Sequence, residues 1–275
     1  MKQITFPMLN LEMNINPVVA EIFGIKIYWY GIIIVASIIL AIFLCKKDDG
    51  KFKIQYEQIL DLCIILIPVA FIGARIYYCI FNINQYTSIW QILNIKDGGL
   101  AIYGAIIAGI IVIYCYCKKK RINTLDLLDY IIPYLSLGQA IGRWGNFVNV
   151  EAYGIETNII WKMGIKDRAT IKYVHPTFLY ESIADFILFI ILQKISKNRK
   201  FKGEITYIYL IGYSFTRFFV EGLRADSLML KNYKISQLIS AIILVAFCII
   251  MLQKTKKQNK STKYKIKDTN ESYEK

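Results

Sequence analysis

Seven long apolar segments constrain this chain more than any other feature of its sequence. A helix that crosses a bilayer needs about 20 consecutive apolar residues. Stretches of that kind cover residues 25–45, 58–81, 99–117, 127–148, 178–195, 204–223 and 235–253. Hydrophobic residues make up 56% of the 275 residues, which is too apolar for an ordinary soluble domain of this length. The sequence therefore predicts an all-α fold, a polytopic membrane helix bundle with seven transmembrane segments.

The Lys and Arg residues between these segments orient the predicted bundle. The connections after the first, third and fifth segments, together with the C-terminal tail, hold 21 of them, whereas the alternate connections hold ten. Positive residues accumulate in cytoplasmic loops. We therefore expect the N-terminus outside and the C-terminus in the cytoplasm.

The same pattern sets the expected domain organisation. We expect one transmembrane catalytic domain over 1–253, with a small exterior cap around 150–177, and a disordered basic cytoplasmic tail over 254–275. The net charge of +14 lies in short runs between apolar segments, so we expect no nucleic-acid partner. The six cysteines include no CxxC pair, which favours buried thiols over a metal site or a disulfide framework.

Polar residues on the fourth segment recur at helical spacing, which places them on one face. They are Gln139, Arg143, Asn146 and Asn149, and Glu151 and Gly154 follow at the outer end of the segment. Because lipid excludes such side chains, this face should look into the bundle or a water-filled cavity. Hydrogen bonds between helices are the alternative explanation, but an Arg, two Asn and a Glu exceed what helix association needs.

The sixth segment has Arg217, Glu221 and Arg224 at spacings i, i+4 and i+7, again on one face. The alternative explanation of this face is a structural ion pair between Arg217 and Glu221, which would reduce the cost of burying either residue. Two arginines against one glutamate leave a positive excess, and with Arg143 they form a site suited to a phosphate group.

Weaker signals lie at the outer ends of other segments. Arg75 is either a site residue or part of a structural ion pair, and Tyr30 is either a site residue or part of an interfacial aromatic belt. The glycines of residues 97–104 suit close packing or backbone contact with a lipid headgroup. His175, the only histidine, precedes Pro176 at a helix start and is either structural or catalytic.

These residues resemble one known family. The stretch from Gly142 to Glu151 and on to Gly154 matches the defining motif of prolipoprotein diacylglyceryl transferases at every fixed position. Further blocks of that family occur in the same order, and the resemblance spans about residues 17–253. The blocks are Tyr30–Gly31, Gly73–Arg75, Asp97–Gly99, His175–Pro176 with Tyr180–Glu181, and Arg217 to Glu221.

The resemblance implies an enzyme that moves the diacylglyceryl group of phosphatidylglycerol onto the lipobox cysteine thiol of a prolipoprotein. A thioether forms and glycerol 1-phosphate leaves. The implied partners are phosphatidylglycerol, the prolipoprotein signal peptide with its lipobox cysteine, and membrane lipids. The family uses no metal and no organic cofactor. The implied location is the bacterial cytoplasmic (inner) membrane, crossed several times.

We expect the following site residues. Catalytic candidates are Arg143, Glu151, Arg217, Glu221, Tyr103 and His175. Candidates for binding phosphatidylglycerol are Arg143, Asn146, Arg217, Tyr30, Gly98, Gly99, Gly104, Asn149, Gly154, Arg75 and Arg224. Many family members have a histidine where this chain has Tyr103. An ordinary phenol titrates near pH 10, so the role of general base is not assigned to Tyr103.

Other classes of protein explain part of the sequence. A different membrane transferase acting on glycerophospholipids, such as an acyltransferase, accounts for the arginines equally well. A transporter of an anionic solute also needs positive charge, but transporters often show internal repeats and binding sites midway through the membrane. This chain has no apparent repeat, and its polar groups gather near one depth.

Overall fold

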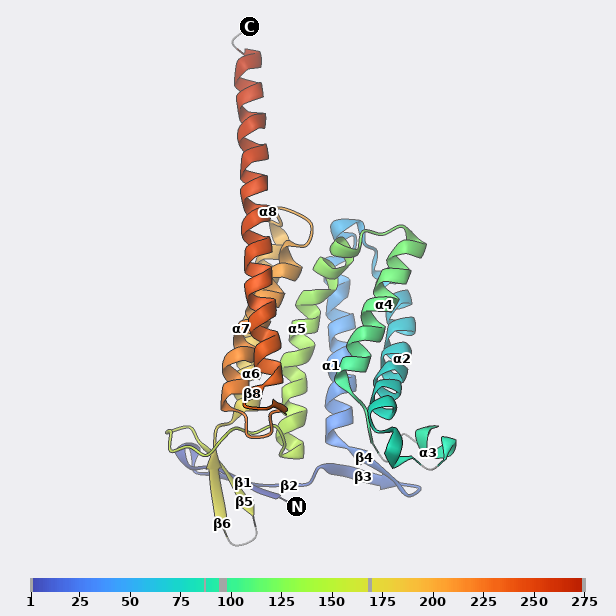
Figure 1. Cartoon of the computed structure of the whole chain (residues 1–275), viewed down its shortest axis with the longest axis vertical. Coiled ribbons are helices and arrows are strands. Elements are labelled where there is room, and N and C mark those ends of the chain that lie inside the picture. The colour runs from blue at the N-terminus through green and yellow to red at the C-terminus, as the bar shows by residue number, and fades with distance from the viewer. Residues whose placement is uncertain (1, 87, 94–97, 168–169, 274–275) are drawn as a thin grey trace. The chain divides into compact units, whose positions relative to one another are not determined.

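The chain is mainly helical, and one helix occupies each of the seven predicted segments (Figure 1). The computed structural model describes residues 2–273 except 87, 94–97 and 168–169. Its α-helices are α1 (Trp29–Cys45), α2 (Tyr56–Phe81), α3 (Ile89–Leu93), α4 (Ile102–Lys120), α5 (Thr124–Asn149), α6 (Thr177–Lys197), α7 (Glu204–Leu223) and α8 (Ile235–Tyr273). The predicted segments 58–81 and 204–223 agree with α2 and α7 to within two residues, whereas α8 continues past residue 253.

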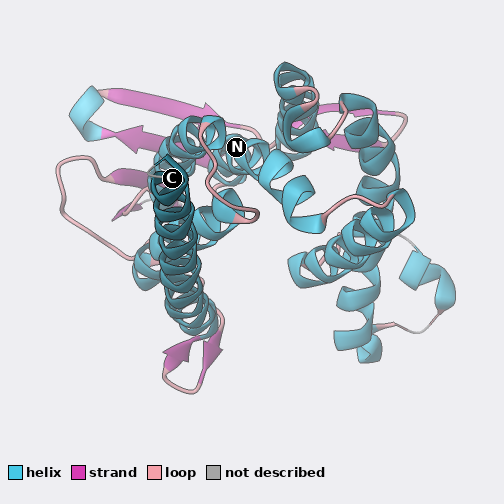
Figure 2. Cartoon of the chain, turned by 90° about the horizontal axis from the view of Figure 1, so that it is seen from above, coloured by secondary structure: helices cyan, strands magenta, loops and turns pink. Residues whose placement is uncertain are grey.

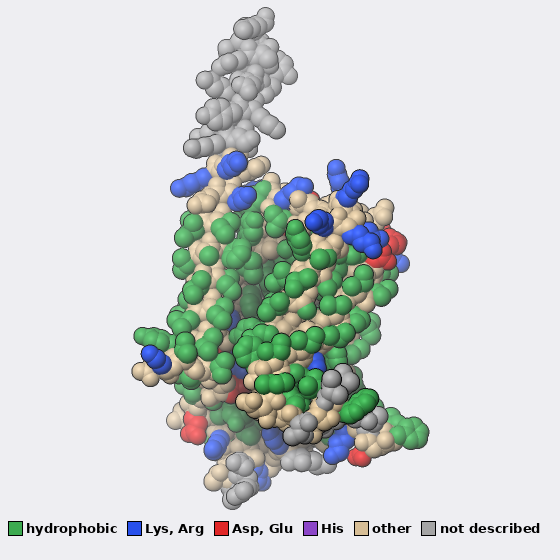
Figure 3. All heavy atoms as spheres, turned by 45° about the vertical axis from the view of Figure 1, so that its right-hand side comes forward, with side chains coloured by type: hydrophobic (Ala, Val, Ile, Leu, Met, Phe, Trp, Pro, Cys, Tyr) green, Lys and Arg blue, Asp and Glu red, His purple; other side chains and the backbone are tan. Residues whose placement is uncertain are grey.

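Within the described part of the chain, four helical stretches are long and apolar enough to cross a membrane. They are Trp29–Asp48, Tyr56–Phe81, Ile102–Lys120 and Ile235–Gln258. Hydrophobic side chains cover the middle of the helices on the face drawn in Figure 3, and Lys and Arg gather at the helix ends. Such a surface suits lipid rather than water. The helical part of the fold prediction is thus confirmed, and the chain is built as a membrane-integral protein.

The all-α prediction omitted several strands, which are magenta in Figure 2. Strands β1 (Lys2–Phe6), β2 (Leu11–Ile15), β5 (Met163–Asp167) and β6 (Thr170–Val174) form an antiparallel sheet in the order β2-β1-β5-β6. Two hairpins are β3 (Val18–Ile22) with β4 (Ile25–Tyr28), and β7 (Met229–Leu230) with β8 (Tyr233–Lys234). The large sheet joins segments far apart in sequence, so no local pattern revealed it.

A small apolar core fixes this sheet to the helices. Ile4 of β1, Met163 of β5 and Val174 of β6 pack with Val150 and Phe178, and all five are buried. Phe178 belongs to the first turn of α6, and Val150 directly follows α5. Because side chains alternate across a strand, one face of the sheet covers these two helix ends. The sheet therefore caps the end where the fourth segment's polar motif lies.

The chain divides into two compact units, which are described separately. The first contains residues 1–44 and 131–275, and the second contains residues 45–130. In the first, hydroxyl groups join α5 to α6. Ser136 Oγ donates to the carbonyl of Asp185 at 2.8 Å, and Ser182 Oγ donates to the carbonyl of Ala140 at 2.8 Å. These bonds fix how the polar faces of the two helices oppose each other.

In the second unit, glycines allow α2 and α4 to touch at backbone distance. A Cβ atom added to Gly104 would overlap the carbonyl group of Gly73, and one added to Gly73 would meet the Ala108 side chain and the Gly104 carbonyl. Small residues permit this kind of close helix approach in membranes. Gly104 was expected to bind lipid, but its fit against Gly73 already requires a glycine.

We expect Gly104→Ala to destabilise the second unit by about 1–3 kcal/mol, because the added methyl group forces α2 and α4 apart. The measurement is thermal unfolding of the purified chain in detergent, followed by the reaction of a thiol dye with the buried Cys79 and Cys117. Gly109→Ala is the matched control on the same helix, since its nearest atom would be Leu66 Cδ1 at 3.6 Å. Equal unfolding temperatures for the two variants would contradict the close contact.

Candidate active site

The buried carboxylate of Glu181 joins two arginines from different helices. Glu181 Oε2 lies 2.7 Å from Arg143 Nε of α5, and Glu181 Oε1 lies 2.5 Å from Arg217 Nη1 of α7. Both arginine side chains are 17% exposed, whereas the Glu181 side chain is 5% exposed. Arg143 and Arg217 therefore point toward one shared centre, as the sequence predicted, and both remain within reach of a ligand.

A second carboxylate completes this network of Arg143, Glu181, Arg217 and Glu221. Glu221 Oε2 lies 2.5 Å from Arg217 Nη2, one helical turn away on α7. The ion pair between Arg217 and Glu221, which the sequence raised as the alternative explanation of this face, is present. The two arginines and two glutamates of this network balance in charge, because Glu181 supplies a second negative charge that the spacing on the sixth segment does not reveal.

Tyrosines of α7 line the polar face of α5. Gln139 Oε1 accepts a hydrogen bond from Tyr209 Oη at 2.8 Å, and Arg143 Nη2 lies 3.5 Å from Tyr213 Oη. The two tyrosine rings stack with their centroids 5.7 Å apart. The predicted common face of Gln139 and Arg143 is thus confirmed, and it faces α7.

The end of the polar motif forms a tight turn around Glu151. Its carboxylate accepts hydrogen bonds from Asn146 Nδ2 at 2.9 Å and Asn149 Nδ2 at 3.4 Å. Its backbone N–H donates to the Asn146 carbonyl at 3.0 Å. Val150 adopts a left-handed φ of 53°, which is rare for a β-branched residue. The buried Val150 side chain in the core beneath the sheet explains how this conformation is kept.

Gly154 lies where three segments pass close together. Its N–H donates to the carbonyl of His175 at 2.9 Å, and the next N–H, of Ile155, donates to the carbonyl of Leu223 at 2.8 Å. A Cβ at Gly154 would meet His175 Cβ at 2.6 Å and the Leu223 carbonyl oxygen at 3.0 Å. Only glycine fits here, so Gly154 joins the ends of α6 and α7 to the motif.

The single histidine is part of a chain of polar rings at the start of α6. His175 Nδ1 lies 3.3 Å from Tyr180 Oη, which accepts a hydrogen bond from Trp161 Nε1 at 2.8 Å. Burial lowers the pKa of His175 below its ordinary value, so the imidazole is neutral at pH 7. A neutral Nδ1 can accept the Tyr180 proton, which orients the ring.

Arg224 does not continue the helical face of Arg217 and Glu221, because α7 ends at Leu223 and Arg224 is extended. Its guanidinium forms a two-pronged pair with Asp226, with N–O distances of 3.0 and 2.9 Å. Burial alone would raise the pKa of Asp226, but the Arg224 guanidinium holds it below its usual range. Lys234 Nζ closes the helix end by donating to the carbonyls of Glu221, Gly222 and Arg224.

Tyr30 of α1 also belongs to the first unit and packs on the motif. A Cβ atom at Gly145 would come within 2.7 Å of the Tyr30 ring. The ring can pack against α5 here because residue 145 is a glycine. Tyr30 itself is 38% exposed. The structure therefore puts Tyr30 on the surface of α5 that carries the motif, which an interfacial belt alone does not explain.

The remaining expected residues belong to the second unit. Arg75 is buried and donates to the carbonyls of Gln91, Ile92, Gly98 and Gly99 at 2.6–3.0 Å. These four hydrogen bonds hold the guanidinium of Arg75 in its buried position. Gly98 and Gly99 both have a positive φ of 80°, which suits the turn around Arg75. Tyr103 is 40% exposed, and Asp97 lies outside the described residues.

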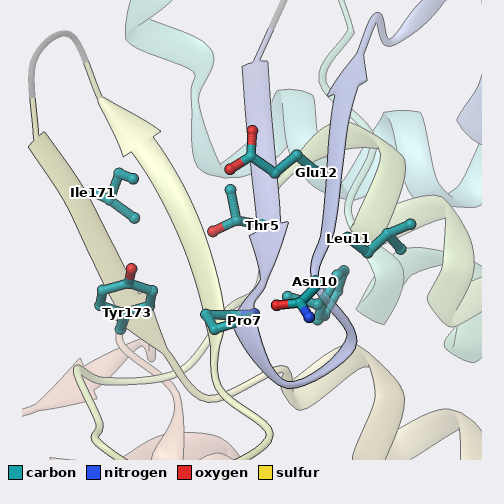
Figure 4. Close-up of a pocket in the computed structure, with 8 residues that line it drawn as sticks. Thr5, Pro7, Asn10, Leu11, Glu12, Ile171 and Tyr173 are labelled. Atoms are coloured by element: carbon teal, nitrogen blue, oxygen red, sulfur yellow. The ribbon is translucent and has the colours of Figure 1, made fainter.

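The four-stranded sheet has a hollow of about 310 Å³ on the face opposite the core. Figure 4 shows Ile171 and Tyr173 on one side and Thr5, Pro7 and Glu12 on the other. Gly164 of β5 pairs with both Thr5 and Tyr173 and lets their side chains pack over it, because a Cβ there would collide with them. The hollow shares no lining residue with the arginine–glutamate network.

Sequence reasoning did not assign three residues to this site: Glu181, Asp185 and Tyr213. The sequence contains two features that point to these residues. Glu181 and Asp185 are carboxylates one turn apart inside an apolar segment, where charge is costly. Tyr213 precedes Arg217 by one turn on the face that holds Glu221.

Comparison with known proteins identifies the family of this chain. The sequence pattern of the prolipoprotein diacylglyceryl transferase family matches residues 17–253. The chain is 48% identical to the phosphatidylglycerol–prolipoprotein diacylglyceryl transferase of Finegoldia magna, over 86% of this chain and 95% of the relative. It is 45% identical to the enzyme of the same name from Clostridioides difficile, over 86% of this chain and 96% of the relative. It is 39% identical to the enzyme of the same name from Listeria monocytogenes, over 89% of this chain and 92% of the relative.

These matches cover the whole helical part of the chain up to residue 253, including every residue of the arginine–glutamate network. The chain belongs to the prolipoprotein diacylglyceryl transferase family.

Proposed function

We propose that this chain transfers the diacylglyceryl group of phosphatidylglycerol to the lipobox cysteine of prolipoproteins, releasing glycerol 1-phosphate. Family membership supports the reaction class. The observation that carries the proposal is the meeting of Arg143 and Arg217 at Glu181, because it holds two guanidinium groups at a fixed separation. The alternative acyltransferase and transporter readings have no comparable support.

Arg143 and Arg217 hold the phosphate of the lipid. A guanidinium has five N–H donors. The contacts described above use Nε and Nη2 of Arg143 and Nη1 and Nη2 of Arg217, so each group retains donors that can bind an oxyanion. Negative charge grows on this phosphate as its bond to the diacylglycerol carbon breaks. Preorganised cations at that point stabilise the transition state.

The acceptor thiol must lose its proton, since the thiolate is the nucleophile. We propose that Glu151 or Glu221 accepts this proton. His175 is a further candidate, because a neutral imidazole can also accept a proton. Asn146 and Asn149 position Glu151, and Asn146 also donates to the headgroup. Tyr30, Gly154 and Arg224 border the lipid site. In the second unit, we propose lipid-binding roles for Gly98, Gly99, Gly104 and Arg75, and a hydrogen-bonding role for Tyr103.

We also propose how the chain lies in its membrane. All seven long helices cross the bacterial cytoplasmic membrane as one catalytic domain over 1–253, with the N-terminus outside. The cap around 150–177 is exterior, and the basic tail 254–275 is cytoplasmic. The excess of Lys and Arg in alternate connections supports this orientation.

The direct test is incubation of the purified chain with phosphatidylglycerol and a lipobox peptide. We expect the peptide to gain the mass of one diacylglyceryl group at its cysteine and glycerol 1-phosphate to appear in equal amount. A lipobox peptide with serine in place of cysteine should gain nothing. A peptide that gains only an acyl chain would support the acyltransferase alternative instead.

We expect Arg143→Lys to lower the transfer rate by about 100-fold or more although the charge is kept, because lysine lacks the planar fork of donors. The measurement is initial transfer to the lipobox peptide. Arg121→Lys, at the exposed end of α4, is the matched control. Near-normal turnover by Arg143→Lys would exclude the proposed grip on the phosphate.

We expect Glu181→Gln to lower both stability and transfer, because Arg143 and Arg217 lose the buried carboxylate that they share. Breaking a buried ion pair on one side typically costs about 3–5 kcal/mol. Thermal unfolding and initial rates measure the two effects, with the exposed Glu57→Gln as control. If both quantities stay at the values of the parent protein, Glu181 does not organise the site.

The proposed orientation predicts which side of the membrane exposes each end. An epitope tag after Lys275 should be cleaved by protease in inside-out vesicles and protected in right-side-out spheroplasts. A cleavage site placed between Asn158 and Ile159 of the proposed exterior cap should behave in the opposite way. Cleavage of both sites from the same side would contradict the proposal, which places three membrane crossings, by α6, α7 and α8, between them.

A further inference from the structure

Asp185 is a buried carboxyl group that the proposed mechanism does not use. It follows Glu181 by one turn of α6, so the two side chains share a helix face. The residue is 1% exposed. Its backbone carbonyl accepts the Ser136 hydroxyl, but its Oδ2 atom has no hydrogen-bond partner among the residues that the structure describes. A carboxyl oxygen in this position needs an explanation.

Charged and titratable groups surround Asp185 on three helices. Arg143 of α5, Glu181 of α6 and Arg217 of α7 interact with it electrostatically. The phenols of Tyr209 and Tyr213 on α7 also interact with it. Arg143 and Arg217 are already matched by Glu181 and Glu221. An ionised Asp185 would therefore give the buried network one uncompensated negative charge beside a like charge.

We infer that Asp185 is an uncharged carboxylic acid in the resting site and that it positions the phosphate of the bound phospholipid. With Asp185 neutral, the network has no net charge and admits the single negative charge of the phosphodiester. With Asp185 ionised, the network repels that charge. Asp185 acts through Arg143 and Glu181, not by contact with the reacting atoms. The role in lipid binding rests on the proposed function, whereas the charge state does not.

A contrary view makes Asp185 an ionised counter-ion of Arg143. The two views differ in what alkaline pH does to lipid binding. If Asp185 starts neutral, raising the pH ionises it and weakens affinity for an anionic lipid. If Asp185 is always ionised, the affinity has no such dependence on this residue. Ordinary phenols titrate near pH 10, so measurements up to about pH 9 leave Tyr209 and Tyr213 protonated.

The first experiment measures the charge state by infrared difference spectroscopy. The full chain and its Asp185→Asn variant are compared in phospholipid nanodiscs at neutral pH. We expect the parent protein to show the carbonyl stretch of a protonated carboxylic acid, shifted by deuterium exchange and lost in the variant. Glu204→Gln is the matched control, a buried carboxylate that accepts the Lys200 N–H at the other end of α7 and should leave the band in place. A difference spectrum showing only loss of a carboxylate band overturns the inference.

The second experiment measures the KM for phosphatidylglycerol between about pH 6.5 and pH 9. We expect this KM to rise with pH in the parent protein, and the ratio of parent to Asp185→Asn KM to increase by about tenfold over the range. Ionisation of the thiol substrate acts on kcat in both proteins and so cancels in that ratio. A ratio that stays flat or falls overturns the positioning role.

Two further outcomes remain decisive. If Asp185→Asn does not fold, the acid band of the parent protein alone, identified by its deuterium shift and by labelling aspartate with carbon-13, answers the question of charge. If the parent protein transfers nothing, the proposed function fails by itself. Calorimetric binding of short-chain phosphatidylglycerol across the same pH range then tests whether Asp185 governs affinity for the anionic headgroup.

Discussion

The shared carboxylate of Glu181 is the interaction on which the rest of the site depends. Two guanidinium groups repel each other and are expensive to bury, so they stay together only if a negative group lies between them. Glu181 provides that group from α6, while Arg143 comes from α5 and Arg217 from α7. The hydroxyl bonds between α5 and α6 and the capping of α7 by Lys234 hold these helices in the register that the contact needs.

The polar motif at the end of α5 is held in shape by contacts among its own residues and with the side chains packed on it. Asn146 and Asn149 hold the Glu151 carboxylate, and Gly145 and Gly154 allow Tyr30 and His175 to come close. The motif is then covered by a sheet made from the N-terminal residues and the connection before α6. The ion pairs of Arg143, Glu181 and Arg217 and the motif around Glu151 thus lie in the same unit of the chain.

Much of this could be predicted from residue spacing. The seven helices follow from apolar runs longer than any soluble core requires, and the common face of Gln139 and Arg143 follows from the helical repeat. The pairing of Arg217 with Glu221 has the same origin, since both lie on one helix. Arg75 shows the limit, because it donates to backbone carbonyls of α3 and of residues 98–99, and a pattern of side chains cannot indicate such acceptors.

By itself, the sequence determined that this chain builds apolar helices and that certain helix faces carry charge, because periodicity within one segment depends only on local geometry. It also determined the family, through a motif matched residue by residue. Only the tertiary structure decided that Glu181 balances the arginines, that Arg224 pairs with Asp226, and that strands β1 and β2 join β5 and β6 in one sheet. Those contacts connect positions far apart in the chain, and their energies exist only once the helices have packed.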